Sequence, residues 1–120
     1  MEIVKDFFYL TLSYNRGAAW GIMSGNMQLF YVVSIAVLII LCYLLYINQY
    51  KKWDFRLPIV MIIGGTIGNL FDRMAYERVR DFLDFYIFGY DYPIFNVADC
   101  FLCIGCVLLI IYILRHPEEN

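Results

Sequence analysis

A run of residues without a charged side chain, from position 17 to position 50, constrains this sequence more than any other feature. A helix that crosses a bilayer needs about 20 consecutive, mostly apolar residues, and the run exceeds that length. In addition, 62% of the residues are hydrophobic, whereas about 45–50% are apolar in a typical soluble domain. The sequence therefore predicts an α-helical integral membrane protein.

Three apolar segments predict three membrane-spanning helices, at residues 28–47, 57–73 and 95–114. The segment at residues 74–94 carries acidic and basic side chains, so it cannot cross the bilayer and must return to the surface from which it came. The polar ends of the second and third helices therefore face one membrane surface. The many aromatic residues of this segment are typical of the headgroup layer and predict an interfacial loop or helix.

Residues 8–14 alternate between apolar and polar side chains, which is typical of a half-buried strand. An Asn-Arg-Gly turn signal follows directly. We therefore expect a small β element within residues 1–26, before the first helix, and a single membrane-embedded domain over residues 1–120.

Lysine and arginine residues near the helix ends set the orientation of a membrane protein. Here both membrane surfaces receive such residues, and their number alone does not decide the orientation. The short loop at residues 48–56 carries the denser cluster, with Lys51, Lys52 and Arg56. We therefore expect this loop in the cytoplasm, and the β element and residues 74–94 on the extracytoplasmic side.

Composition disfavours several classes of function. The net charge of −2 leaves no basic surface for a nucleic acid. The only histidine, His116, is predicted at the membrane surface opposite the polar helix ends, so neither a Ser-His or Cys-His couple nor a zinc-binding histidine pair is expected. The four cysteines lie in apolar segments and are expected as small buried hydrophobes. We expect no metal and no cofactor, and carboxylates remain as the candidate chemical groups.

Asp99 lies within the third apolar segment. The helical rise of about 1.5 Å per residue places it roughly 22 Å from position 114, in the outer third of a ~30 Å hydrocarbon core. A carboxylate at that depth is costly and indicates a site with a partner. The alternative is a side chain that reaches the interface or makes one structural hydrogen bond.

Small side chains accompany Asp99 on one stripe of its helix, which holds Asp99, Cys103, Cys106 and Ile110. On the second helix, small and polar residues share one face: Gly65, Gly68, Asn69 and Asp72. Small residues let helix backbones approach closely in a membrane, and Gly64 with Gly68 forms one such pair. We expect these two faces to pack together, although such glycine pairs are mostly structural.

Three carboxylates could approach Asp99 from the end of the second helix and the segment after it, namely Asp72, Asp81 and Asp84. Spacing alone does not choose among them, and Asp72 could instead pair with Arg73 or Arg78. Two carboxylates in a poorly solvated site share one proton, so one activates a water while the other donates to a carbonyl oxygen. Peptide hydrolysis needs such a pair.

Four motifs are spread over nearly the whole chain: NRGAAWG at residues 15–21, GGTIGNLFDR at 64–73, VRDF at 79–82 and FNVAD at 95–99. Their order and spacing resemble the lipoprotein signal peptidase family, also called signal peptidase II. The resemblance implies an aspartyl endopeptidase of the bacterial cytoplasmic (inner) membrane, with its active site toward the extracytoplasmic face. It would remove the signal peptide of a prolipoprotein immediately before a cysteine that carries diacylglyceryl.

The resemblance also implies roles for individual residues. It assigns the catalytic dyad to Asp81 and Asp99. Substrate binding falls to four polar residues, Asn15, Asn69, Arg73 and Asn96. Structural or orienting roles fall to Gly17, Gly65, Gly68, Asp72 and Ala98. The implied partners are the prolipoprotein and membrane lipid.

The resembled family has four membrane-spanning helices, and its first helix carries an Asp-Gln-x-x-Lys motif. This sequence has three predicted helices and no such motif, so we expect it to lack the family's first helix. Two alternatives therefore stay open: a truncated, inactive or accessory homologue, and a small proton-coupled transporter subunit. The transporter is the weaker alternative, because its acid should lie near the midplane of the membrane.

Overall fold

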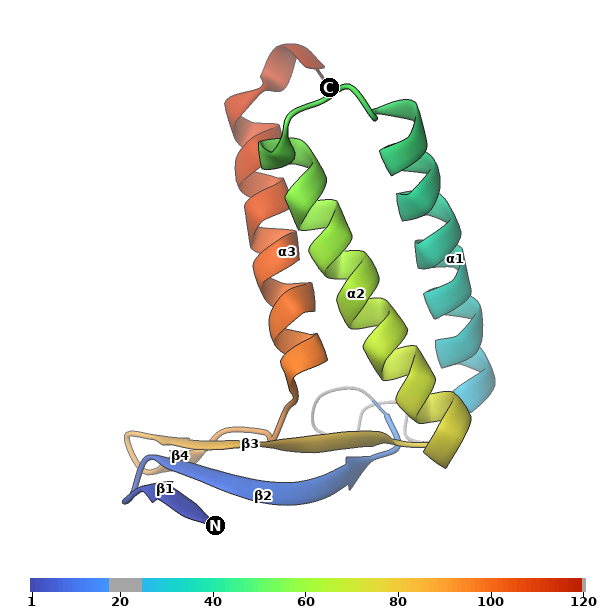
Figure 1. The fold of residues 1–120 in the computed structure, drawn as a ribbon. Coiled ribbons are helices and arrows are strands. Elements are labelled where there is room, and N and C mark those ends of the chain that lie inside the picture. The colour runs from blue at the N-terminus through green and yellow to red at the C-terminus, as the bar shows by residue number, and fades with distance from the viewer. Residues whose placement is uncertain (18–24, 120) are drawn as a thin grey trace.

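The computed structural model describes residues 1–17 and 25–119, whose arrangement is shown in Figure 1. Three long helices stand side by side: α1 (Met27–Ile47), α2 (Trp53–Tyr76) and α3 (Val97–Arg115). All three are long and apolar enough to cross a membrane, which confirms the three predicted helices. A short 3-10 helix, η2 (Pro117–Glu119), follows α3.

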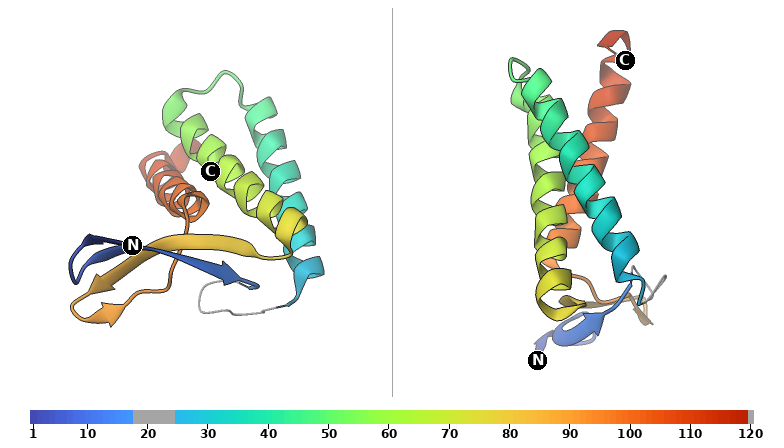
Figure 2. Two further views of the ribbon diagram at one scale, coloured as in Figure 1. Left: turned by 60° about the horizontal axis from the view of Figure 1, so that its bottom comes forward. Right: turned by 90° about the vertical axis from the view of Figure 1, so that its right-hand side faces the viewer.

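α2 lies between the other two helices (Figure 2). It extends beyond the predicted residues 57–73 at both ends. Pro58 lies in its second turn, where the missing N–H leaves the Asp54 carbonyl oxygen without its usual helical donor. Glu77 ends the helix in the left-handed region, with a φ of 57°, and its N–H donates to the Arg73 carbonyl at 2.9 Å.

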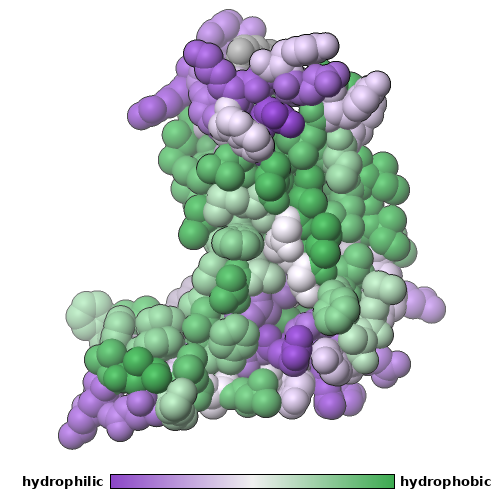
Figure 3. All heavy atoms as spheres, viewed as in Figure 1, coloured by the Kyte–Doolittle hydropathy of each residue, from purple (hydrophilic) through white to green (hydrophobic). Residues whose placement is uncertain are grey.

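Most apolar side chains of the helices point outward. On α1, for example, Val32 and Ile39 are 66% and 65% exposed. Figure 3 shows the resulting apolar band along the helices, between hydrophilic residues at the two ends. Such a surface is suited to lipid tails and not to water, as expected for the helices of a membrane protein.

A four-stranded antiparallel sheet lies across one end of the helices (Figure 1). Its strands follow the order β1 (Glu2–Val4), β2 (Phe8–Asn15), β3 (Val79–Ile87) and β4 (Tyr90–Asp91). In the central pair, Tyr9 lies opposite Asp84 and Ser13 lies opposite Asp81. The register between these two pairs shifts, which marks a β-bulge in β2. β2 confirms the strand predicted from residues 8–14.

The segment at residues 74–94 corrects the expectation of an interfacial loop. β3 and β4 occupy much of it, and Phe88 and Gly89 join them in a tight turn with φ values of 51° and 80°. β3 forms because its backbone pairs with β2, which is a contact between distant parts of the sequence. The predicted return is present, since α3 begins at the end of the bundle where α2 stops (Figure 1).

Glycines let α2 and α3 approach each other closely. A Cβ atom added at Gly65 would lie 2.5 Å from the Ala98 carbonyl oxygen, and one added at Gly68 would lie 3.2 Å from the Ala98 Cβ atom. Further along, a Cβ atom at Gly105 would lie 2.8 Å from the Pro58 carbonyl oxygen. The predicted small-residue face of the second helix is therefore packed against the third, and Gly65, Gly68 and Ala98 are part of the contact.

The face predicted for the third helix was wrong. Cys103, Cys106 and Ile110 are exposed, whereas Ala98 and Leu102 contact α2. The contacting residues form the neighbouring stripe of the helix, because successive residues turn by about 100°. The expectation that the cysteines are buried fails for the same reason, since only Cys100 is partly covered by protein. Asp99 consequently lies at the edge of the contact between the helices.

Candidate active site

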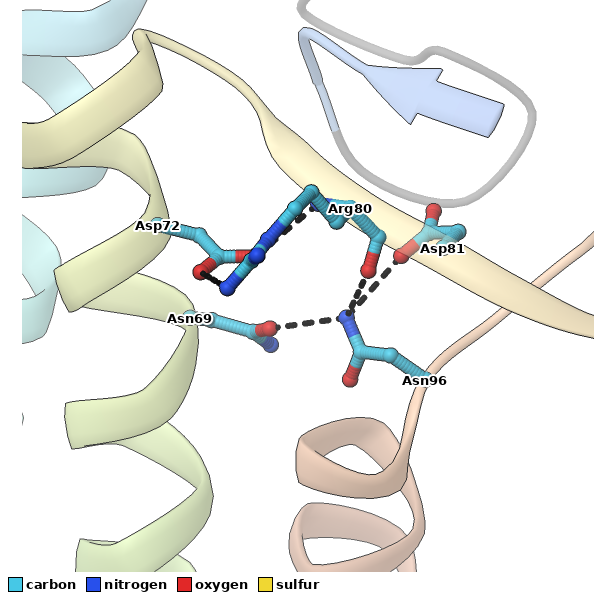
Figure 4. A network of polar contacts seen from close by, with 5 residues as sticks. All are labelled: Asn69, Asp72, Arg80, Asp81 and Asn96. Atoms are coloured by element: carbon cyan, nitrogen blue, oxygen red, sulfur yellow. Dashed lines mark hydrogen bonds and ion pairs between the residues drawn. The ribbon is translucent and has the colours of Figure 1, made fainter. Parts of the chain in front are cut away.

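Polar side chains gather where α2, the sheet and α3 meet. They are Asn69, Asp72 and Arg73 near the end of α2, Asn15 in β2, Asp81 in β3, and Asn96 and Asp99 at the start of α3. Figure 4 shows five residues of the network that they form. The structure therefore brings together all six residues for which a catalytic or substrate-binding role was expected.

Asn96 and Asp99 fix the start of α3. The Asn96 Oδ1 atom accepts from the Asp99 backbone N–H at 2.8 Å, and the Asp99 Oδ2 atom accepts from the Asn96 N–H at 3.1 Å. This reciprocal arrangement is a capping box, which satisfies two N–H groups that a helix start leaves without partners. One oxygen of the Asp99 carboxylate is thereby held in place by the helix itself.

The amide of Asn96 links the two candidate catalytic acids. Its Nδ2 atom lies 2.9 Å from Asp81 Oδ1 and 3.0 Å from Asn69 Oδ1, and 3.3 Å from the Arg80 carbonyl oxygen (Figure 4). The Asn69 Nδ2 atom in turn donates to Asp99 Oδ1 at 3.0 Å. Two amides therefore form a continuous hydrogen-bonded bridge between Asp81 and Asp99.

Burial and a neighbouring charge change the acidity of Asp81. Its side chain is only 3% exposed. Burial, which is the largest cause, and the nearby charge of Asp99 together raise the pKa of this carboxyl group from 3.8 to about 6. Hydrogen bonds from Asn15 and Asn96 and the charge of Arg73 oppose the increase. A carboxyl group of this kind can hold a proton near neutral pH and can also release it.

The Arg73 side chain, on α2, places a positive charge in the pocket that Asp81 and Asp99 also line. Its guanidinium lies over the ring of Phe30 on α1, 4.2 Å from the ring centroid. The adjoining Tyr31 hydroxyl donates to the Arg73 carbonyl oxygen at 2.9 Å. None of the described residues accepts a hydrogen bond from the guanidinium, and Arg73 lines the same pocket as Asp81 and Asp99. Its N–H groups are therefore available to a ligand in that pocket.

Asp72 connects β3 to α2. Its Oδ2 atom accepts from the Arg80 backbone N–H at 3.0 Å and from Arg80 Nε at 3.2 Å, and its Oδ1 atom lies 3.0 Å from Arg80 Nη2 (Figure 4). The suggested pairing of Asp72 with Arg73 or Arg78 is therefore wrong. Arg80 takes this place because β3 brings its backbone N–H directly to the end of α2. Since Arg80 precedes Asp81, the contact also positions Asp81.

Asp84 does not approach Asp99. It lies three residues beyond Asp81 on β3, and successive strand residues point to opposite faces. Its Oδ2 atom accepts from the Thr11 hydroxyl at 2.9 Å. Of the three carboxylates that spacing had left open, Asp81 is thus the one that lines the same pocket as Asp99. Asp72 is instead bonded to Arg80.

A pocket of about 520 Å³ lies beside this network. Its polar part is lined by five of the residues above, namely Asn15, Asn69, Arg73, Asp81 and Asp99. Its apolar part follows α3 and the segment before it, with Ile94, Phe95, Leu102, Cys103 and Ile104. The pocket can therefore hold a ligand that is polar at one end and apolar along the membrane-spanning helix.

Gly17 also belongs to the pocket wall. It is buried, and its backbone N–H donates to Asn15 Oδ1 at 2.8 Å. The rest of the first motif, residues 18–21, lies outside the described residues.

Two carboxyl groups and a set of amides are the chemical groups that this site offers. Among residues 1–17 and 25–119, no three His, Cys, Asp or Glu side chains come together as a metal site requires. Sequence reasoning missed Arg80, Phe30 and Tyr31, which hold Asp72 and Arg73. Only the contact between a strand and a helix end reveals Arg80, and no sequence signal distinguishes it from Arg78.

Known proteins are similar to this chain in sequence and in fold. Residues 1–115 match the family described as Signal peptidase (SPase) II. A curated protein of Staphylococcus haemolyticus (strain JCSC1435), named lipoprotein signal peptidase, is 45% identical over 120 residues, which are 99% of this chain and 75% of that protein.

Two solved structures, each described as a bacterial membrane enzyme determined by the in meso method, are also similar to this chain. The first, at 2.3 Å resolution, has a TM-score of 0.89 and 40% identity, and the match covers 99% of this chain and 73% of that chain. The second, at 1.9 Å resolution, has a TM-score of 0.83 and 41% identity, over 96% of this chain and 74% of that chain.

Proposed function

This chain belongs to the signal peptidase II family, and from that membership we propose that it is an aspartyl endopeptidase which cuts prolipoproteins immediately before the diacylglyceryl-modified cysteine. The family makes it a membrane peptidase that removes signal peptides. The aspartyl mechanism, the position of the cut and the residue roles are the proposed part.

The observation that carries the proposal is the amide bridge between Asp81 and Asp99. Asn96 and Asn69 hold one oxygen of each carboxylate at 2.9 and 3.0 Å, so the two acids face a common space beside the pocket. The raised pKa of Asp81, about 6, favours one shared proton in the pair. A monoprotonated pair is the state that acid–base hydrolysis of a peptide bond requires.

In the proposed reaction, the ionised carboxylate removes a proton from a water molecule, whose oxygen attacks the carbonyl carbon of the residue before the cysteine. The protonated carboxyl donates its proton to the carbonyl oxygen, which gives a neutral tetrahedral intermediate. That intermediate collapses when the cysteine nitrogen receives a proton and the C–N bond breaks. One water is consumed, and a new carboxyl group and a new amine leave the site.

Four polar residues would bind the substrate. The Arg73 guanidinium, which donates no hydrogen bond to a described residue, would donate to the carbonyl oxygen where negative charge develops. Asn15, Asn69 and Asn96 would orient the peptide and the acids. The apolar wall of the pocket, with Leu102 and Ile104, would accept the diacylglyceryl chains or the signal-peptide side chains.

We place the sheet and the acids on the extracytoplasmic side of the bacterial cytoplasmic membrane. Lys51, Lys52 and Arg56 lie at the opposite end of the bundle, together with Arg115 at the end of α3 (Figure 1). Basic residues of short loops are retained in the cytoplasm, which supports this orientation.

The decisive experiment uses the purified protein in detergent or lipid vesicles with a synthetic lipopeptide that carries diacylglyceryl-cysteine. Asp81→Asn and Asp99→Asn should each lower the cleavage rate by at least about 10²-fold. Asp84→Asn is the matched control, because Asp84 is a buried aspartate on the same strand but points away from the site. It should retain activity.

Full activity in either dyad variant would exclude the proposed mechanism. Absence of cleavage by the unmodified protein, with the fold intact, would instead favour the inactive or accessory homologue. Mass spectrometry of the products should place the new N-terminus at the lipid-modified cysteine, and a cut elsewhere would exclude the proposed position.

A further inference from the structure

A second pocket, of about 610 Å³, adjoins the first one at Asp81. The two pockets share four lining residues, namely Asn15, Asp81, Pro93 and Ile94. The remaining walls of the second pocket come from the sheet and its edges: Ser13, Tyr14, Arg16, Arg78, Tyr90 and Asp91. We call this second pocket the sheet groove.

The two pockets differ in chemistry. The first follows α3, where Leu102, Cys103 and Ile104 form an apolar wall along a membrane-spanning helix. The sheet groove lies outside the helices, and eight of its ten lining residues carry a polar or charged side chain. A chain that crosses Asp81 therefore passes from an apolar environment into a polar one.

Two arginines give the sheet groove its charge. Arg78 lies over the ring of Tyr14, with 4.3 Å between the guanidinium carbon and the ring centroid. Neither Arg78 nor Arg16 makes a side-chain hydrogen bond or ion pair with the described residues. The one acid that lines the groove apart from Asp81 is Asp91, and its interaction with the neighbouring Asp84 raises the pKa of the Asp91 carboxyl group.

We infer that the sheet groove binds the first residues of the mature chain, downstream of the cleaved bond, and that Arg78 selects acidic side chains there. The inference rests on the proposed function, because Asp81 must mark the bond that is cut. The signal peptide and the acyl chains are apolar and belong with the membrane-side pocket. The mature chain is the hydrophilic part of the substrate, so the polar groove fits it.

The position of Arg78 determines which residue it meets. Arg78 directly precedes β3 and lies three residues before Asp81. Extended chains advance about 3.3 Å per residue, so the separation along the sheet is roughly 10 Å. An extended substrate advances by the same amount, which brings its third or fourth residue after the cut to Arg78.

The test compares lipopeptides that are identical except for Asp, Asn or Lys at the third and fourth residues of the mature chain. Partly exposed ion pairs contribute about 0.2–1 kcal/mol, so kcat/KM should be about 1.4- to five-fold higher for Asp than for Lys. Arg78→Gln should remove this preference, and Arg78→Glu should reverse it. Misfolding cannot reverse a preference, so the reversal identifies direct contact.

Arg56→Gln is the matched control. Arg56 also stacks on an aromatic ring, 4.7 Å from the centroid of Trp53, and its Nε atom also has no partner, but it lies at the far end of α2. This variant should keep the preference of the unmodified protein. A preference for Asp that survives in both Arg78 variants would overturn the inference.

A binding measurement distinguishes a failure of this inference from a failure of the proposed function. The same three lipopeptides, labelled with a fluorophore, are titrated against the Asp99→Asn variant and followed by anisotropy. Charge-dependent binding without cleavage by the unmodified protein would refute the proposed function and retain the groove. Cleavage without charge dependence would refute the groove alone. An effect of Arg78 that varies with anionic lipid content and not with the peptide would assign the groove to a lipid headgroup, and would also overturn the inference.

Discussion

Asn96 and Asp99 hold each other at the start of α3, with 2.8 Å between Asn96 Oδ1 and the Asp99 N–H and 3.1 Å between Asp99 Oδ2 and the Asn96 N–H. The same two side chains face the site, through Asn96 Nδ2 toward Asp81 and through Asp99 Oδ1 toward Asn69. A candidate catalytic acid is thus also a structural element of its own helix. Changes at Asp99 therefore act on chemistry and on stability, and the two effects can be separated.

Asp99→Asn and Asp99→Ala should differ in stability although both should be inactive. An asparagine at this position still has an oxygen that can accept from the Asn96 N–H, whereas alanine has none. The lost hydrogen bond should make Asp99→Ala less stable than Asp99→Asn by about 1 kcal/mol. Denaturant unfolding in detergent measures this difference. Equal stability of the two variants would show that the capping box contributes nothing measurable.

Asp72→Ala should reduce activity more than Arg80→Gln does. Asp72 holds the backbone N–H of Arg80 at 3.0 Å, and that hydrogen bond survives when only the Arg80 side chain is changed. The Arg80 side chain is 44% exposed, so its own ion pair should contribute little. We expect Asp72→Ala to lose about 1 kcal/mol of stability, because the partly buried N–H of Arg80 loses its carboxylate acceptor.

Cleavage rate and thermal unfolding of the two variants give the comparison. Asp72→Asn serves as an intermediate control, because its amide oxygen can still accept from the Arg80 N–H. A larger effect of Arg80→Gln than of Asp72→Ala would mean that the exposed ion pair, and not the backbone hydrogen bond, holds β3 to α2.

Gly65→Ala should push α2 and α3 apart next to the site. The added methyl group would lie 2.5 Å from the Ala98 carbonyl oxygen and 2.8 Å from Leu102 Cγ. Overpacking of this kind costs about 1–3 kcal/mol, and it should also lower the cleavage rate because Ala98 adjoins Asp99.

Two other glycines provide controls for this change. Gly64→Ala should be tolerated, because its nearest neighbour would be Phe101 at 3.9 Å. Gly105→Ala should destabilise the protein with a smaller effect on activity, since its clash with Ile62 and the Pro58 carbonyl lies away from the acids. Thermal unfolding and cleavage assays of all three variants check the prediction, which fails if Gly64→Ala and Gly65→Ala behave alike.

Stability should fall as the pH rises through about 6, and Asp81 should be the cause. The pKa of Asp81 in the folded protein is raised from 3.8 to about 6, mainly by burial, so the folded state binds this proton more tightly than the unfolded state. The stabilisation is complete below pH 3.8 and is lost as the pH rises through about 6. The shift corresponds to at most about 3 kcal/mol.

Asp81→Asn removes this titration. The free energy of unfolding of the variant, relative to the unmodified protein, should therefore increase between about pH 4 and about pH 8. In parallel, kcat/KM of the unmodified protein should decline above about pH 6, because the pair then loses its shared proton. A difference in stability between the two proteins that does not change with pH would contradict the prediction.

The helices and β2 could be predicted from the sequence because each depends on a property of its own segment. Uncharged segments of sufficient length predict membrane helices, and the alternation at residues 8–14 predicts β2. The sequence also placed Asn69 and Asp72 on the face of α2 that turns inward, because a helix repeats every 3.6 residues. Asp99 was identified as a functional candidate from its depth alone.

The remaining features depend on contacts between distant parts of the chain. β3 contains Arg80, Asp81 and Asp84 among its apolar residues, so its pattern does not predict a strand, and only pairing with β2 reveals it. The choice of Asp81 over Asp84 depends on which face of that strand meets α3. The stripe of α3 that contacts α2 differs by one residue from the predicted one, because Ala98 is small enough to fit beneath Gly65.

Asp81 belongs to the sheet and Asp99 to the helix bundle, and the sheet lies across one end of the bundle (Figure 1). In a bilayer they respond to different forces: hydrocarbon thickness sets the tilt of the helices, whereas the headgroup layer supports the sheet. The bridge of Asn96 and Asn69 crosses the joint between them. A change in hydrocarbon thickness that tilts the helices would therefore change the separation of the two acids, and we expect the cleavage rate to depend on the lipid composition of the membrane.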